Sequence, residues 1–191
     1  LPESLPEKIV VATLETEDRT FYEHEGVAWR SVARAVVQNA RHFKILSGAS
    51  TLPMQVARMQ RPSSRTPLAK LREAVEGTRL GSNHGHDAVL RQYLQIAPYG
   101  NRAHGVVRAA RLYFDKPVED VSWLQAAFLA ALPQQPGRMN PYDGPGRTRA
   151  LKRARRILES LHGRGIISAD DLRVAINSDL GLVKPKVRPP E

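Results

Sequence analysis

The chain has 191 residues, no cysteine, and a formal net charge of +10 from 29 Lys and Arg against 19 Asp and Glu. This length suits one domain with a sizeable buried core. The lack of cysteine excludes a disulfide framework and a thiolate metal site. The excess of cations favours an anionic partner, such as nucleic acid, acidic lipid or a phosphorylated substrate, but charge alone does not choose among them.

No stretch reaches the roughly 18 consecutive apolar residues typical of a membrane span, and the first residues lack the pattern of a signal peptide. Residues 1–6 and 184–191 have the proline-rich composition of linkers. We therefore expect a domain over about residues 1–180, a linker or tail over 181–191, and a longer natural protein around them.

Helical periodicity dominates the chain, and strand-like alternation is nearly absent. The predicted helices span about residues 9–18, 29–43, 50–60, 68–80, 87–96, 106–114, 122–132 and 147–163. A capping pattern at 168–171 predicts a last helix, and turns are predicted at 81–85 and 98–101. The predicted fold class is therefore mainly α.

A dense group of ionisable side chains follows the apolar run at residues 9–12. From Glu17 the sequence reads Glu-Asp-Arg-x-Phe-Tyr-x-His-x-Gly. Composition alone is equally consistent with a polar helix end and turn. The spacing, however, resembles the first signature of the peptidoglycan glycosyltransferases, glycosyltransferase family 51.

Four further stretches resemble the later signatures of that family and come in the same order. They are residues 47–55, 70–73, 89–114 and 119–142. The resemblance covers about residues 8–175, and residues 51–58 look closest to the C subtype of class A penicillin-binding proteins. It implies a lysozyme-like helical domain with a small membrane-contacting jaw subdomain at about residues 28–47.

The resemblance also assigns the chemistry. The reaction joins a sugar hydroxyl to an anomeric carbon, and a lipid diphosphate is the leaving group. It therefore requires a base for the hydroxyl and positive charge near the phosphates. By resemblance, Glu17 deprotonates the 4-hydroxyl of the acceptor N-acetylglucosamine. Glu73 is the second catalytic carboxylate, and it assists departure of the diphosphate directly or through a divalent cation, Mg or Mn, for which it is the expected ligand.

The resemblance implies a wider set of substrate-binding residues around these two acids. They are Asp18, Ser50, Gln55, Arg58, Arg65, Lys70 and Arg72. The cations suit a diphosphate, since guanidinium groups bind phosphate in a bidentate manner. Lys70 and Glu73 are three residues apart, so on a helix they share a face. Phe21 and His24 are expected to shape the site rather than react.

Four positions depart from the family pattern. Ala69 replaces an Arg, Ala49 a Gly, Arg91 a Glu and Gln95 an Asn. The first change removes a cation from the phosphate side, and the third replaces an acid by a base in the structural helix. These changes bear on the efficiency of the site more than on its identity, because both catalytic carboxylates are present.

The expected function is polymerisation of lipid II disaccharide units into glycan strands, with release of undecaprenyl diphosphate, at the outer face of a bacterial cytoplasmic membrane. The expected partners are lipid II, the growing glycan chain, the membrane surface and a fused transpeptidase domain outside this chain; nucleic acid is not expected. The expected membrane contacts are Trp29, Phe43, Ile45 and Leu46.

Two alternatives remain at this stage. A lysozyme-like, glycan-cleaving enzyme could use Glu17 as its general acid, although the basic third motif would then have no diphosphate to bind. A nucleic-acid-binding helical module could use the basic helix near residues 147–164, although no recognised nucleic-acid motif accompanies it.

Overall fold

The computed structural model describes residues 1–24, 26–27, 50–62 and 66–184. In these residues the secondary structure is helical, apart from one isolated bridge between Pro98 and His104. The prediction of a mainly α chain is therefore confirmed. The expected jaw at 28–47, the helix predicted at 29–43 with its membrane contacts, and Ala49 and Arg65 lie outside the described residues.

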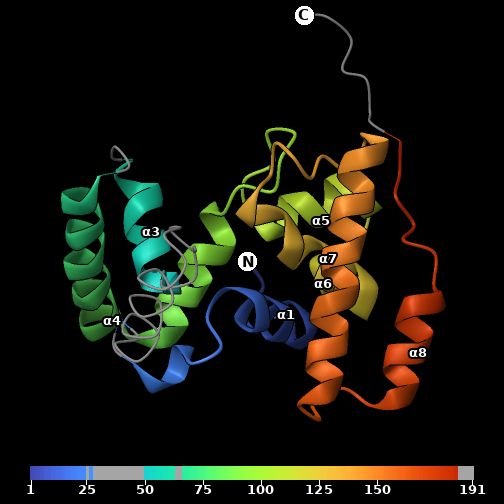
Figure 1. Cartoon of the computed structure of the whole chain (residues 1–191), viewed down its shortest axis with the longest axis horizontal. Helices are drawn as coiled ribbons and strands as arrows, with labels where there is room; N and C mark the ends of the chain where they lie inside the picture. Colours follow the sequence, from blue (N-terminus) through green and yellow to red (C-terminus); the bar gives the residue numbers. More distant parts are fainter. Residues whose placement is uncertain (25, 28–49, 63–65, 185–191) are drawn as a thin grey trace, which may run out of the picture. The chain divides into compact units, whose positions relative to one another are not determined.

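The helices follow one another in the order shown in Figure 1. They are α1 (Glu7–Glu17), η1 (Phe21–Glu23), α3 (Leu52–Gln60), α4 (Pro67–Ile96), α5 (Val106–Phe114), η2 (Val118–Asp120), α6 (Trp123–Ala131), η3 (Leu132–Gln134), α7 (Gly144–Gly163) and α8 (Ala169–Asn177). They divide into two compact units, one formed by Leu1–Thr16 with Ala97–Glu191 and the other by Glu17–Ile96.

The first unit is built around α6, which is buried from Leu124 to Ala131. Its many alanines let neighbouring helices approach closely, and α7 packs against it with α8 alongside α7 (Figure 1). The buried stripe of α7 has helical spacing, and it includes Ala150, Ala154, Ile157, Leu158 and Leu161. Most of the charged residues of α7 lie outside this stripe and are exposed.

Helix ends in this unit follow capping chemistry. The last helix begins as predicted, with a capping box between Ser168 and Asp171. The start of α7 differs from the prediction, because the helix begins at Gly144 rather than near residue 147. Asp143 accepts a hydrogen bond from the Gly146 amide at 2.8 Å, and Pro145 is tolerated in the first turn, where its missing N–H leaves no bond unmade.

The second unit pairs α3 with α4, which consists of two helices joined at a kink at Gly85. Gly77 lets α3 and α4 approach, because a Cβ atom at this position would lie 2.9 Å from the backbone nitrogen of Met54. The turn predicted at 81–85 is correct only at Gly85, where φ is 74° and ψ is 166°. Residues 81–84 remain helical, since one residue in a glycine-only conformation is enough to redirect the chain.

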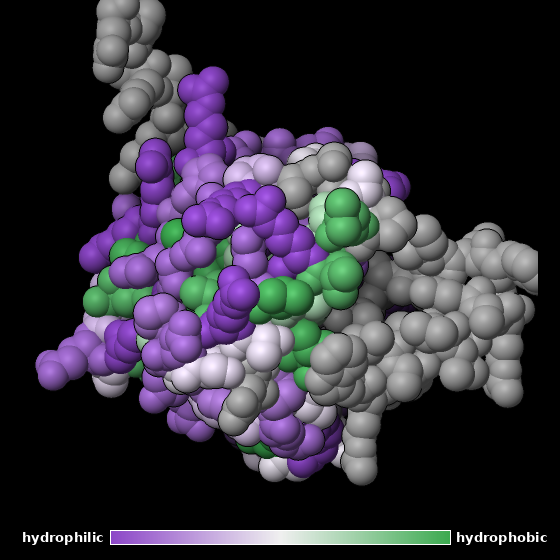
Figure 2. All heavy atoms as spheres, turned by 90° about the vertical axis from the view of Figure 1, so that its left-hand side faces the viewer, coloured by the Kyte–Doolittle hydropathy of each residue, from purple (hydrophilic) through white to green (hydrophobic). Residues whose placement is uncertain are grey.

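The outer face of α4 carries exposed apolar side chains. Leu68, Leu71 and Val75 are 77%, 63% and 46% exposed. Figure 2 shows this side of the molecule, where apolar surface is interspersed with strongly hydrophilic side chains. In the part of the chain that the structure describes, no helix combines the length and the apolar character needed to cross a membrane.

Candidate active site

Glu17 is the last residue of α1 and is half-buried. The side-chain amide of Gln55, from α3, donates a hydrogen bond of 3.0 Å to Oε2 of Glu17. A neutral amide donor orients a carboxylate without adding a positive charge beside it. The first and second motifs of the sequence therefore meet at the carboxylate that was predicted to act as the base.

Asp18, the next residue, is buried and caps α3 from outside that helix. Its Oδ2 accepts the backbone N–H of Leu52 at 2.9 Å, in the first turn of α3, where N–H groups lack helical partners. The adjacent Thr51 does not cap the helix, because its hydroxyl donates to the carbonyl of Gly26. The carboxylate at the positive end of the helix dipole fixes the start of α3 next to Glu17.

His24 completes this arrangement. Its Nδ1 accepts the backbone N–H of Gly26 at 3.1 Å, so Nε2 carries the proton and donates to Oδ1 of Asp18 at 3.0 Å. The ring lies edge-on to Phe21, with 6.4 Å between the ring centroids. Both ring nitrogens of His24 thus hold the loop that follows Glu17, which is the geometry of a positioning residue.

The third motif supplies an ion pair on one face of α4. Nζ of Lys70 lies 2.9 Å from Oε2 of Glu73 and donates to Oγ of Ser50 at 2.5 Å. The contact confirms that Lys70 and Glu73 share a helix face. Glu73 is largely buried whereas Lys70 is partly exposed, so the ammonium group remains available to an anion.

The arginines differ in their surroundings. Arg58 is exposed in the last turn of α3 and forms no ion pair with another described residue. Arg72 has a different partner from Lys70, since its Nε lies 3.0 Å from Oε1 of Glu76. Glu76 also lies 3.5 Å from Arg61. Arg58 is therefore the more available of the two arginines for binding a phosphate.

A divalent cation fits this site only with help from a substrate. No group of three or more His, Asp or Glu side chains among the described residues has the arrangement of a metal site. Glu73 offers a single carboxylate, and Mg²⁺ is commonly bound through one or two carboxylates together with substrate phosphates. The donor set thus fits a cation that arrives with a diphosphate.

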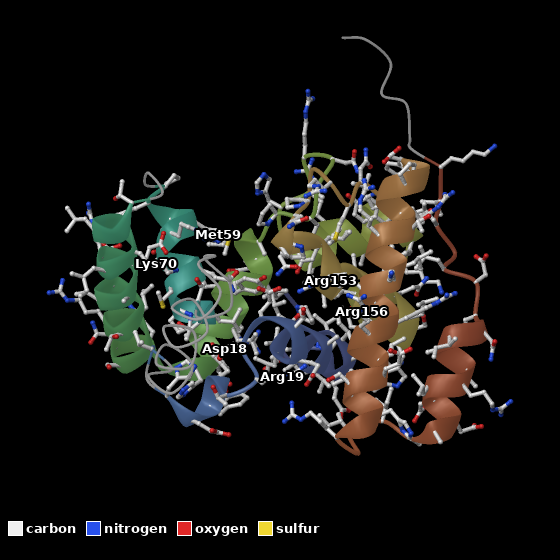
Figure 3. All side chains as sticks on the ribbon, viewed as in Figure 1. Asp18, Arg19, Met59, Lys70, Arg153 and Arg156 are labelled. Atoms are coloured by element: carbon white, nitrogen blue, oxygen red, sulfur yellow. The ribbon has the colours of Figure 1, made fainter. Side chains whose placement is uncertain are left out.

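Residues 50–55 form a platform that contacts three other motif residues. Ser50 meets Lys70, the Leu52 amide meets Asp18, and Gln55 meets Glu17. All of these residues belong to the second unit. Figure 3 shows Asp18 and Lys70 within it. The arrangement places the carboxylate of Glu17, the predicted base, and a cation paired with a second carboxylate around one short segment.

Two elements of this site were not anticipated from the sequence. One is the Leu52 backbone amide, and the other is Glu76, which draws Arg72 away. An Asp that caps a helix 34 residues later leaves no local pattern. The spacing of Arg72 and Glu76, four residues apart, is in contrast a recognisable helical ion-pair signal. Of the departures from the family pattern, Ala69 has its amide capped by the hydroxyl of Thr66 at 3.1 Å.

Comparison with known proteins identifies the family. Residues 2–162 match the profile of the family described as Transglycosylase. The chain belongs to this family. Penicillin-binding protein 1A of Aquifex aeolicus (strain VF5) is 33% identical over 183 residues, which cover 95% of this chain and 25% of that protein. The family resemblance predicted from the motifs is thereby confirmed.

Further relatives are of both the 1A and the 1C type. Penicillin-binding protein 1C of Escherichia coli (strain K12) is 34% identical over 171 residues, covering 90% of this chain and 22% of that protein. The transglycosylase chain thus spans about a quarter or less of the length of these relatives. Because both types match at similar identity, the C-subtype resemblance of residues 51–58 stays a prediction.

A solved structure supports the fold. The crystal structure of penicillin-binding protein 1A from Haemophilus influenzae matches with a TM-score of 0.56 and 19% sequence identity, covering 99% of this chain and 19% of that chain. At this level of identity the likeness concerns the fold alone. It agrees with the helical domain expected for a transglycosylase.

Proposed function

We propose that this transglycosylase domain is a peptidoglycan glycosyltransferase that polymerises lipid II disaccharide units into glycan strands and releases undecaprenyl diphosphate. The observation that carries the proposal is the platform at residues 50–55. It brings the carboxylate of Glu17 and the Lys70–Glu73 ion pair to one short segment of a chain in this family. A base and a phosphate-binding cation are the two groups that the reaction requires.

Glu17 takes the proton of the acceptor 4-hydroxyl. The hydroxyl oxygen bonds to the anomeric carbon of the donor as the bond from that carbon to the diphosphate oxygen breaks, and the configuration at the carbon inverts. The amide of Gln55 holds one carboxylate oxygen of Glu17 in place. Orientation of this kind lowers the barrier because the base need not be ordered during the reaction.

Lys70 and Arg58 stabilise the charge that develops on the departing diphosphate, and Arg65 and Arg72 are the further expected cations. Lys70 is held by Ser50 on one side and Glu73 on the other, so its ammonium group is preorganised for this role. A divalent cation bound to Glu73 and the diphosphate would neutralise part of the same charge. Glu73 also holds the ammonium group of Lys70 in position through their ion pair.

The lipid-linked substrate and the length of the relatives suggest where this domain acts and which domain is fused to it. A lipid-linked donor requires access to a membrane surface, and the exposed apolar residues of α4 next to exposed cations suit an interfacial position. The proposed location is the outer face of a bacterial cytoplasmic membrane. A fused transpeptidase domain outside this chain is the proposed covalent partner, in keeping with relatives several times longer.

The contacts of α7 disfavour the nucleic-acid alternative. Arg149 donates to the carbonyl of Arg138, Arg153 to Thr16, and Arg164 to Glu15. Three cations of the basic segment therefore have partners within the chain. The glycan-cleaving alternative is disfavoured by Lys70, because glycan cleavage produces no diphosphate for an ordered cation to stabilise.

The test is incubation of the purified chain with lipid-linked disaccharide, with and without a divalent cation, followed by separation of the products by size. Formation of polymer that lysozyme digests supports the proposal. Release of soluble sugars from purified cell wall without polymer formation would support the glycan-cleaving alternative. Salt-dependent retardation of nucleic acid, without conversion of lipid-linked disaccharide, would support the third alternative.

A further inference from the structure

A histidine outside all of the motifs contacts the loop that follows Glu17. His86 is half-buried, and its Nε2 lies 2.9 Å from the backbone carbonyl oxygen of His24. A carbonyl oxygen only accepts hydrogen bonds, so Nε2 of His86 carries the proton and is the donor. The bond joins α4 to a loop that lies 62 residues earlier in the sequence. Both residues belong to the second unit.

The kink in α4 determines how His86 approaches this loop. Gly85, directly before it, has φ 74° and ψ 166°, and α4 changes direction there (Figure 1). No atom of a described residue lies within 4 Å of a Cβ atom built at Gly85, so the glycine is not there for lack of room. The backbone conformation requires it. The side chain that follows this conformation is the one that reaches His24.

Aromatic contacts fix the ring of His86. Its centroid lies 5.1 Å from that of Phe21, with the planes at 90°, and 5.5 Å from that of Tyr22. These separations are typical of paired aromatic rings. The imidazole is therefore held against its neighbours while it donates to the carbonyl of His24.

The chain is also fixed to α4 just after this loop. A Cβ atom at Gly26, where φ is 145°, would overlap the Cα of Thr78 in the first half of α4. The carbonyl of Gly26 accepts the hydroxyl of Thr51, next to α3. The first half of α4 thus contacts the chain at Gly26, and the second half contacts it through His86.

His24 transmits this constraint toward the base. Its carbonyl accepts the bond from His86, while its Nε2 donates to Oδ1 of Asp18 at 3.0 Å. Asp18 is the neighbour of Glu17 in the chain, and its other oxygen accepts the first amide of α3 at 2.9 Å. Gln55, in the same helix, donates to Glu17. A displacement of His24 therefore acts on both the backbone neighbour and the hydrogen-bond donor of Glu17.

We propose that His86, acting through His24, is a positioning residue for the base Glu17. The inference rests on the proposed function, in which Glu17 takes a proton. A base must be held within a fraction of an ångström of its productive position, and a displacement of about 1 Å can cost roughly 100-fold in rate. His86 supplies part of this constraint through the backbone of the loop.

The first variant separates the hydrogen bond from the packing of the ring. His86→Phe keeps an aromatic ring against Phe21 and Tyr22 but has no donor for the carbonyl of His24. We expect kcat for polymer formation to fall at least about 10-fold while KM stays within about twofold, because the base is displaced and the diphosphate-binding cations are not. A residue that only stabilised the fold would lower the unfolding transition and leave kcat of the folded protein unchanged. His84→Phe, an exposed change just before the kink, is the matched control and should keep the wild-type kcat.

Two amide variants keep the test decisive if His86→Phe does not fold. The side-chain nitrogen of Gln corresponds in position to Nε2 of His, whereas that of Asn corresponds to Nδ1. His86→Gln should therefore retain the bond to His24, and its kcat should exceed that of His86→Asn at least about fivefold. Equal kcat values for these two variants would overturn the inference.

A second readout does not depend on activity. The side-chain amide of Gln55, which contacts Glu17, and the ring nitrogens of His24 have NMR signals of their own. These signals should shift in His86→Phe and stay unchanged in His84→Phe.

A folded His86→Phe variant with the kcat of the wild type would overturn the inference. If the wild-type chain fails to polymerise lipid-linked disaccharide, the proposed function fails, and the Gln55 signal then decides the positioning role by itself. A shift of this signal in His86→Phe supports the role, and an unchanged signal overturns it. Failure of the inference and failure of the proposed function are therefore distinguishable.

Discussion

The side-chain amide of Gln55 donates a hydrogen bond of 3.0 Å to the carboxylate of Glu17, across 38 residues of sequence. This bond joins the end of α1 to α3. Asp18 accepts a hydrogen bond from the backbone amide of Leu52, the first residue of α3. Ser50, two residues before α3 begins, accepts a hydrogen bond from Lys70. The geometry of Glu17 therefore depends on how α3 begins.

Replacing Gln55 should slow the reaction without unfolding the chain. In Gln55→Ala, Glu17 loses its orienting donor, and hydrogen bonds to charged groups are worth about 1.5–3 kcal/mol. If this bond is maintained in the transition state, kcat for polymer formation should fall about 10- to 100-fold. Gln60→Ala, at the exposed end of the same helix, is the control and should retain full activity. Equal rates for the two variants would contradict the orienting role.

Lys70 should matter for departure of the diphosphate. Lys70→Met removes the cation while keeping much of the side-chain volume, so the charge on the leaving group is no longer stabilised. We expect a loss of about 100-fold or more in kcat/KM, the size typical for loss of one preorganised electrostatic contact. Arg79→Gln, an exposed change on the same helix, should have no such effect. Turnover within a few fold of wild type in Lys70→Met would refute this assignment.

Asp18 should contribute mainly to stability. In Asp18→Ala the Leu52 amide and the Nε2 proton of His24 lose their acceptor, and a buried group left unsatisfied costs about 1–3 kcal/mol. Urea unfolding should show a fall of this size in the free energy of unfolding. Glu23→Ala, an exposed change in the same segment, should change it by less than about 0.5 kcal/mol. Identical unfolding curves for both variants would count against the capping role of Asp18.

Tyr113 should make the first unit lose stability at high pH. The pKa of Tyr113 is raised from 10.0 to about 12, chiefly by burial; the hydrogen bond from Asn101 lowers it and the nearby Tyr142 raises it, and both effects are smaller. The unfolded chain therefore loses this proton first, so the contribution is present below pH 10 and is lost as the pH rises toward 12.

The measurement compares the wild type with Tyr113→Phe, in which this group does not titrate. The difference in unfolding free energy between the two proteins should fall by about 1.4 kcal/mol from pH 8 to pH 11, since each pKa unit is worth about 1.36 kcal/mol. A difference that stays constant over this range would show that Tyr113 titrates normally in the folded chain.

Most of the helices could be predicted from the sequence because their signals are local. Apolar spacing identifies α5, α6 and α7, and the Ser168 capping pattern identifies the start of α8. Glycine signals were read too broadly, since only Gly85 interrupts α4. A glycine favours a turn only where its backbone conformation requires one, and that depends on tertiary packing.

The candidate site residues could be named from motifs, but their mutual contacts could not. The pairing of Lys70 with Glu73 follows from helical spacing, whereas the contacts of Gln55 with Glu17 and of Asp18 with Leu52 join separate segments. Glu15 illustrates the same limit. It is buried and contacts Ser160 and Arg164, which lie about 145 residues later and which no local pattern connects with it.

The most direct test of the proposed function is the rate at which Glu17→Gln polymerises lipid-linked disaccharide, measured beside the wild type under identical conditions. The amide keeps the size of the side chain but cannot accept the acceptor's proton. Polymer formation should fall by at least about 100-fold, the contribution typical of a general base, while the unfolding transition stays close to that of the wild type. Full turnover by a folded Glu17→Gln variant would contradict the assignment of Glu17 as the base.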